Sequence, residues 1–178
     1  MTYRQVLREL AYNTHGVVTL RSAGELGVPA AEVRKLASRG ALKRLGKGVY
    51  RMLEAPRTAL DEFAEAVALV GPDAVLADES VLAAHALGQV NLRRIKVATS
   101  RRLRHDLPPT VEIVRRRVGD QERDDIDGIP TMSLPAAILA ARGTVLPERL
   151  IEAVHQAAAR ELITPSARHE VLESLGRE

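Results

Sequence analysis

The stretch GALKRLGKGVYR, residues 40–51, combines glycine and lysine in a way that resembles a phosphate-binding loop. The Walker A loop has four residues between its first glycine and the Gly-Lys pair, then a Ser or Thr that binds magnesium. Here five residues separate Gly40 from Gly46, and Gly48 stands where the hydroxyl is required. A phosphate-binding loop also follows a strand and opens a helix. This stretch is instead preceded by a predicted helix and contains a predicted strand, so a nucleotide site is disfavoured.

A β-hairpin fits the same stretch better. Residues 42–45 and 49–52 are two strand-like runs, joined by the three residues Gly46, Lys47 and Gly48. Three-residue loops that contain glycine are typical of hairpins. Such a hairpin would carry Lys47 at its tip, where the ammonium group can reach a DNA phosphate.

Three helices are predicted before this hairpin, over residues 3–13, 20–26 and 29–39, with a short β-branched run at 17–19. Gly27 is expected to end the second helix in the left-handed conformation. Pro29 suits the first position of the third helix, because no amide hydrogen is needed there. Two helices joined by a short glycine-containing turn indicate a helix-turn-helix, and the following hairpin makes it a winged helix.

Charge supports a nucleic-acid partner for this segment. Residues 1–54 hold ten Lys and Arg against four Asp and Glu, a net charge of +6. The remaining residues hold sixteen against nineteen, a net charge of −3. Positive charge concentrated in one segment is the electrostatic pattern of a nucleic-acid binder, although a solvated basic surface gives the same pattern.

A second domain is predicted after a linker at 53–58. Thr58 is expected to cap a helix through residue 69, followed by a helix at 81–87 that Gly88 closes. Strands are predicted at 94–99, 110–116 and 126–131, and helices at 134–141, 147–160 and 165–175. The predicted fold class is therefore α+β. A winged helix over 1–54 precedes a mixed α/β domain over 58–178, which has a small sheet and a helical C-terminus.

Composition excludes several other classes. The chain has no cysteine, so neither disulfides nor a Cys-ligated zinc site is available. Aromatic residues make up only 2%, so Ala, Leu and Val must fill the core. No apolar signal segment and no run of membrane-spanning length is present, which favours a cytoplasmic protein.

Several stretches resemble the AbiEi-type antitoxins of type IV toxin–antitoxin systems. They are Val17-Val18-Thr19, ELGVPAAEVRKLASRGALKRLGKGVYR, ADESVLAAHALG and GIPTMSLPAAILAA, with LASRGALKRLGKGVYR at the centre of the similarity. The resemblance implies a winged helix that binds inverted repeats in its own promoter and represses the operon. It also implies a C-terminal domain that serves antitoxicity, a nucleotidyltransferase toxin as partner, and a dimer or two cooperating copies on DNA.

The resemblance also selects DNA-contacting residues. They lie on the third helix and on the hairpin: Ala30, Arg34, Lys35, Ser38, Arg39, Lys43, Arg44, Lys47 and Arg51. Arg21 and Ser22 on the second helix are also predicted to contact DNA. One departure is Pro29, which stands where such sequences often carry a Ser helix cap. A related group joins this winged helix to a nuclease-like domain with Asp and Glu-x-Lys metal ligands. The nearest counterparts here are Asp106 and Glu112, and Val114 replaces the lysine, which disfavours a nuclease.

A second basic patch is predicted between residues 93 and 117. This stretch holds only two acids, Asp106 and Glu112. Its nine cations are Arg93, Arg94, Lys96, Arg101, Arg102, Arg104, Arg115, Arg116 and Arg117. The patch is interpreted either as a surface for phosphates or an acidic partner, or as solvated charge. The acidic run at 122–127 could instead neutralise it within the fold.

No catalytic or cofactor site is predicted. The five histidines never pair at metal-ligand spacing, and Glu152-x-x-His155 is only half of a di-iron pattern. Ser80 and His85 share one segment, but no third group is evident that would orient the histidine. We therefore expect a DNA-binding repressor and antitoxin that is not an enzyme and needs no metal or cofactor. The alternative is a protein-interaction module whose DNA binding is vestigial.

Overall fold

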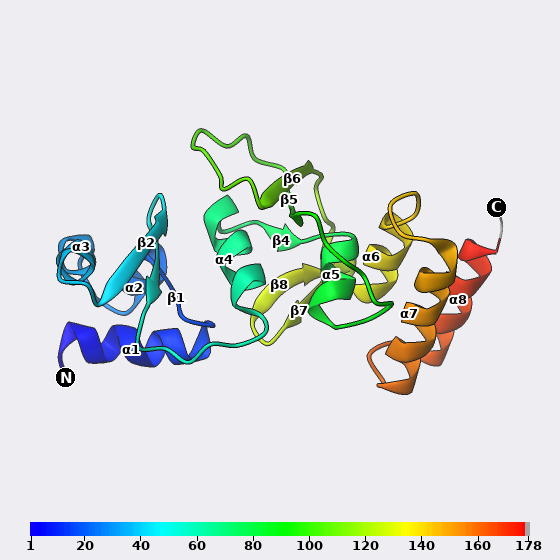
Figure 1. Cartoon of the computed structure of the whole chain (residues 1–178), viewed down its shortest axis with the longest axis horizontal. Helices are drawn as coiled ribbons and strands as arrows, with labels where there is room; N and C mark the ends of the chain where they lie inside the picture. Colours follow the sequence, from blue (N-terminus) through cyan, green and yellow to red (C-terminus); the bar gives the residue numbers. More distant parts are fainter. Residues whose placement is uncertain (177–178) are drawn as a thin grey trace. The chain divides into compact units, whose positions relative to one another are not determined.

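The structure is a computed structural model that describes residues 1–176, and its α+β class is as predicted. The chain divides into two compact units (Figure 1). The first comprises Met1–Pro72 together with Leu103–Leu107, and the second comprises Asp73–Arg102 and the chain from Pro108 onward. Each unit has its own sheet.

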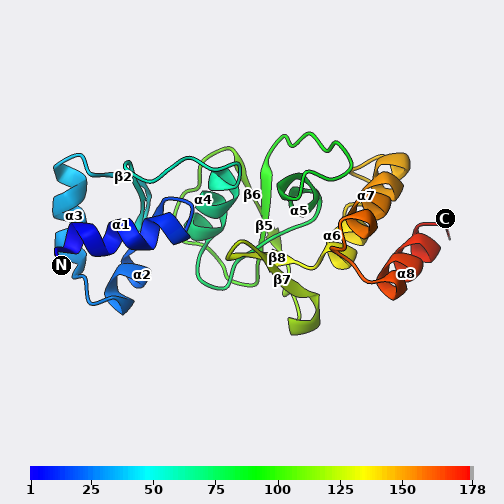
Figure 2. The same ribbon diagram turned by 90° about the horizontal axis from the view of Figure 1, so that it is seen from below.

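The first unit contains the three predicted helices and the predicted hairpin. Its elements are α1 (Tyr3–Asn13), β1 (Val17–Thr19), α2 (Leu20–Glu25), α3 (Ala30–Ser38), β2 (Leu42–Gly46), β3 (Val49–Met52) and α4 (Asp61–Val70). The strands form an antiparallel sheet in the order β1-β3-β2. Figures 1 and 2 show α1, α2 and α3 gathered around this hairpin.

Local hydrogen bonds set the helix ends. Thr2 and Gln5 form a capping box at the start of α1, and Thr19 and Ser22 form one at the start of α2. Gly27 follows α2 at φ +75°, as predicted. Pro29 is the N-cap of α3 rather than its first helical residue, and it supplies no side-chain hydrogen bond to the helix.

The central strand β3 is buried along its whole length. Side chains alternate between the two faces of a strand. Tyr50 and Met52 belong to the core formed with the helices, which includes Leu7, Ala11, Val18, Ala23, Val28, Val33, Leu42 and Ala55. Arg51 lies on the opposite face and contacts residues of α4. Helix α4 therefore covers the second face of this small sheet.

The extent of the first unit differs from the predicted domain of residues 1–54. It continues through α4 to Pro72, because Arg51 pairs with Asp61 and Glu65 of that helix. Close packing of Gly46 against Leu69 adds to this attachment, since a Cβ on Gly46 would lie 2.5 Å from Leu69 Cδ2.

The second unit is built on a five-stranded mixed sheet. Its elements are β4 (Val75–Leu76), α5 (Glu79–Ala84), β5 (Ile95–Thr99), β6 (Val111–Arg115), the 3-10 helix η1 (Asp120–Glu122), β7 (Arg123–Ile126), β8 (Ile129–Met132), α6 (Leu134–Ala140), α7 (Pro147–Ala159) and α8 (Pro165–Leu175). The strand order is β6-β5-β4-β8-β7, with β4–β8 and β5–β6 parallel.

Two details of the second unit depart from the predicted elements. The acidic run at 122–127 is largely strand β7, which pairs with β8 in a hairpin around Asp127 and Gly128. The helix predicted at 81–87 is α5, which begins and ends earlier. Its following glycine, Gly88, approaches α7 so closely that a Cβ would lie 2.7 Å from the carbonyl oxygen of Arg149. Across residues 1–176, no helix is both long and apolar enough to cross a bilayer.

Candidate nucleic-acid interface

Helix α3 presents cations to solvent along its exposed face. Arg34 and Arg39, its C-cap, are exposed and have no acidic partner within the described part of the chain. Lys35 Nζ lies 3.8 Å from Glu32 on the same helix, an exposed pair that holds the lysine only weakly. Ala30 is half-buried, and the Ser38 hydroxyl donates to the Lys35 carbonyl oxygen.

The two predicted contacts on α2 have partners within that helix. Arg21 Nε lies 3.3 Å from Glu25 Oε1, with both side chains mostly exposed. The Ser22 hydroxyl donates to the Thr19 carbonyl oxygen and accepts a hydrogen bond from the Thr19 amide. Ser22 is therefore a helix-capping residue, whereas Arg21 remains accessible.

The hairpin exposes Lys43, Arg44 and Lys47. Its turn consists of Lys47 and Gly48 rather than three residues, because Gly46 pairs with Val49 at the end of β2 after a register shift. The Leu20 amide donates to the Gly48 carbonyl oxygen at 2.9 Å and ties the turn to the start of α2. Lys47 thus projects from an anchored turn.

Arg51 is not available to DNA, which corrects the prediction for this residue. Only 2% of it is exposed. Its Nη2 lies 2.9 Å from Asp61 Oδ2, and its Nη1 lies 3.2 Å from Glu65 Oε1 and donates to the His15 carbonyl oxygen. A Cβ on Gly16 would lie 2.9 Å from the guanidinium carbon, so glycine is needed there. Arg51 is on the α4-facing side of β3 because side chains alternate along a strand.

Asp61 is the central acid of this buried cluster. Burial acts to raise its pKa, but the Thr58 hydroxyl and amide both donate to its Oδ1. These hydrogen bonds, together with the positive charges of Arg51 and Arg57, outweigh burial and hold the pKa of Asp61 below its usual value of 3.8. Asp61 is therefore ionised at neutral pH and neutralises Arg51.

Ion pairing separates the cations of the first unit into two groups. Arg4 and Arg8 lie beside Glu54, and Arg51 and Arg57 pair with Asp61. By contrast, α3, its C-cap and the hairpin carry five exposed cations that have no ion pair among residues 1–176, namely Arg34, Arg39, Lys43, Arg44 and Lys47. Arg44 donates only to the Gly46 carbonyl oxygen of its own strand. This group is the candidate nucleic-acid interface.

The second basic patch is partly neutralised within the fold. Lys96 Nζ lies 2.8 Å from Glu79, Arg116 Nη1 lies 2.6 Å from Asp78, and Arg101 Nε lies 3.5 Å from Asp73. None of these pairs uses an acid of the run at 122–127, which the sequence suggested as the neutralising segment. The remaining six members are exposed: Arg93, Arg94, Arg102, Arg104, Arg115 and Arg117. Arg104 belongs to the first unit, so the predicted patch is divided between units.

The residues considered for catalysis are divided between the two units or buried in one of them. Asp106 belongs to the first unit, whereas Glu112 lies on β6 of the second unit. Ser80 is buried, and its hydroxyl oxygen accepts a hydrogen bond from the Lys96 amide. Within residues 1–176, no three His, Asp or Glu side chains gather in a way that could hold a metal ion.

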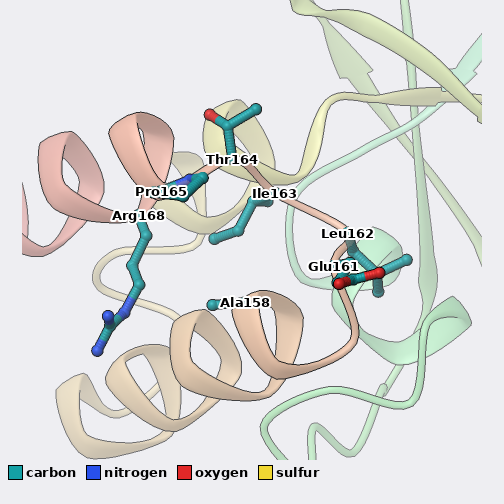
Figure 3. A pocket seen from close by; sticks show the side chains of 7 residues that line it. All are labelled: Ala158, Glu161, Leu162, Ile163, Thr164, Pro165 and Arg168. Carbon is teal, nitrogen blue, oxygen red and sulfur yellow. The ribbon is translucent and has the colours of Figure 1, made fainter.

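A surface hollow of about 570 Å³ lies at the turn between α7 and α8 (Figure 3). It is lined by Ala158, Glu161, Leu162, Ile163, Thr164, Pro165 and Arg168. Its side chains are mainly apolar, with one acid and one arginine. None of the residues selected from the sequence lines it.

Comparison with known families finds a similarity that lies within the first unit. Residues 5–52 match the model of the family described as transcriptional regulator, AbiEi antitoxin. This match confirms the resemblance for residues 5–52 and ends at the last residue of β3. The stretches ADESVLAAHALG and GIPTMSLPAAILAA lie outside it. Over this segment, the chain is similar to the transcriptional regulators of the AbiEi antitoxin family. No curated protein matches the chain.

The sequence did not lead us to predict that α4 covers the sheet and pairs with Arg51. A signal was present, because strand alternation places Arg51 on the face opposite Tyr50 and Met52. A charged residue on a buried strand requires acidic partners. Asp61 and Glu65, one helical turn apart, were the nearest pair of acids that one helix face could present.

Proposed function

We propose that the protein is a DNA-binding repressor and antitoxin, and that its first unit acts as a winged helix-turn-helix. The supporting observation is the group of five exposed cations on α3, its C-cap and the hairpin that have no ion pair within residues 1–176. Helix α3 would enter the major groove with Arg34 directed at bases or phosphates, and Lys47 would contact the backbone. Phosphate contacts position the protein, whereas base contacts specify the sequence.

The proposed operator is an inverted repeat in the protein's own promoter. A dimer, or two copies that bind cooperatively, would match the symmetry of such a site, with half-sites spaced by about one helical turn of DNA or a multiple of it. Binding there would repress the operon. The second unit would provide antitoxicity against a nucleotidyltransferase toxin, in a protein that acts in the cytoplasm by binding rather than by catalysis.

A mobility-shift titration on the DNA upstream of the gene tests the proposal. The double variant Lys47→Ala, Arg34→Ala should bind at least about tenfold more weakly, because it loses one phosphate contact and one contact of about 1–3 kcal/mol. Arg8→Ala is the matched control, since Arg8 is a cation of the same unit that lies beside Glu54. The repressor proposal fails if the wild type binds this DNA no more tightly than a random duplex.

Two further measurements address the antitoxin and non-enzyme parts of the proposal. Coexpression with a nucleotidyltransferase encoded next to the gene should restore growth that the toxin alone stops. DNA incubated with the protein and magnesium or manganese should stay intact. Metal-dependent cleavage would instead support the nuclease alternative.

A further inference from the structure

The first unit contains one segment from the second half of the chain, Leu103–Leu107. It comes from the connection between β5 and β6, drawn as a green trace beside α4 in Figure 1. Burial alternates along it: Leu103, His105 and Leu107 are half-buried, whereas Arg104 and Asp106 are exposed. The segment therefore packs one face against the first unit and presents its two charged side chains to solvent.

A hydrogen bond attaches this segment to the end of α4. His105 Nε2 lies 2.8 Å from the Leu69 carbonyl oxygen. Since a carbonyl oxygen only accepts, His105 Nε2 must donate. This carbonyl is one of the last four of α4, which have no partner within the helix. His105 thus gives the Leu69 carbonyl oxygen a hydrogen-bond partner and attaches the segment that carries Arg104 to the end of α4.

The same residue of α4 also contacts the hairpin. The side chain of Leu69 packs on Gly46, where a Cβ would lie 2.5 Å from Leu69 Cδ2. Gly46 directly precedes Lys47 at the turn. Leu69 therefore contacts both segments. Its side chain packs on Gly46 at the base of the hairpin turn, and its carbonyl oxygen accepts the hydrogen bond from His105.

Helix α4 provides a fixed support for these contacts. Arg51 of β3 binds both Asp61 and Glu65, so the helix is attached to the central strand of the sheet by buried charges. The Arg104 segment is consequently held to the same framework as Lys47. Arg104 has no ion-pair or hydrogen-bond partner among residues 1–176, and its guanidinium group is exposed.

We propose that Leu103–Leu107 acts as a second wing, in which Arg104 contacts a DNA phosphate beside the one reached by Lys47. The inference rests on the proposed DNA binding of the first unit. DNA is favoured over an acidic protein because the segment is attached through Leu69 to the hairpin that carries the unpaired cations. Asp106 would lie near the same backbone and oppose binding.

The salt dependence of binding tests the contact made by Arg104. Each phosphate contact contributes about 0.9 to the slope of log K against log salt concentration. Arg104→Gln should lower the magnitude of that slope by about one, on operator and random duplex alike. Asp106→Asn should tighten binding to both. Arg168→Gln, an exposed arginine of α8 in the second unit, is the matched control and should leave the slope unchanged.

A double-mutant cycle tests whether His105 positions Arg104. His105→Ala should reduce the slope as much as Arg104→Gln does, and the double variant should lose no more than either single variant. His105→Gln, whose amide can donate in place of Nε2, should restore part of the loss. Thermal melts of each variant separate loss of contact from loss of folding.

The outcomes distinguish this inference from the proposed function. If the wild type does not prefer its operator, the repressor proposal fails, and the second wing with it. If the wild type binds its operator but Arg104→Gln and Asp106→Asn leave the slope and affinity unchanged, the second wing is refuted and the repressor proposal stands. If Arg104→Gln lost binding to an acidic protein while its binding to DNA stayed intact, Arg104 would be assigned to a protein partner. That outcome would also refute the inference.

Discussion

At the scale of residues, Arg51 shows how one side chain can change from a candidate DNA contact into a structural element. Its guanidinium group lies over Gly16 and between Asp61 and Glu65, with 2% of the residue exposed. A buried charge is costly unless it is paired and hydrogen-bonded. Removing one partner of such a cluster leaves the other charges buried without compensation.

Arg51→Leu should therefore lower the free energy of unfolding by about 3–5 kcal/mol, because Asp61 stays buried beside Glu65. Arg57→Ala is the matched control. Arg57 pairs with the same Asp61 carboxylate but is 73% exposed, so its loss should cost less than about 1 kcal/mol. Urea unfolding of both variants measures the difference. Equal losses would show that burial of Arg51 has no special effect.

Asp61 also gives the stability of the first unit a defined pH dependence. Its folded pKa lies below the usual value of 3.8, so the unfolded state binds the proton more readily. The stabilisation by Asp61 is therefore fully present above pH 3.8 and is lost as the pH falls through the lower folded pKa. As the pH falls below 3.8, the difference between the free energies of unfolding of the wild type and of Asp61→Asn should therefore become smaller. A difference that grows on acidification would contradict the assigned shift.

At the scale of elements, β3 explains why α4 belongs to the first unit. A three-stranded sheet with helices on one face would leave the other face of its central strand exposed. Val49 and Arg51 lie on that face and are both buried, and α4 supplies the cover with Leu69 and two acids. The matched family segment ends at residue 52, before this helix begins.

This arrangement predicts which fragment folds. A fragment of residues 1–72 should unfold cooperatively and melt at a higher temperature than one of residues 1–54, which leaves Arg51 without acids and Val49 without cover. Circular dichroism melts of the two fragments test this expectation. A fragment of residues 1–54 with the same melting temperature would show that α4 adds no stability to the sheet.

At the scale of the whole molecule, the net charge of +3 conceals an uneven distribution. The first 54 residues carry the excess of positive charge. On α3, its C-cap and the hairpin, all the exposed cations except Lys35 lack an ion pair within residues 1–176. In the second unit, Asp73, Asp78 and Glu79 neutralise three of the predicted patch cations. The first segment therefore differs from the patch in the elements that carry its unpaired cations, which are α3, its C-cap and the hairpin.

Much of the first unit follows from residues close together in the sequence. The capping pairs Thr2–Gln5 and Thr19–Ser22 act over three residues, and the glycines after α2 and in the hairpin act at single positions. Such signals depend on local backbone geometry, which the sequence alone largely specifies. The helices, the hairpin and the exposed residues Arg34 and Lys47 were accordingly predictable.

Only the tertiary structure decided which basic residues remain exposed. Arg51 pairs with acids ten and fourteen residues later in the sequence, and His105 binds a carbonyl thirty-six residues earlier. Residue type alone does not tell whether a charged side chain meets solvent, DNA or a buried carboxylate. The sequence by itself thus determined the local elements and the excess of charge. Long-range packing decided that Arg51 is structural and that Arg104 belongs to the first unit, because burial and pairing depend on contacts between distant segments.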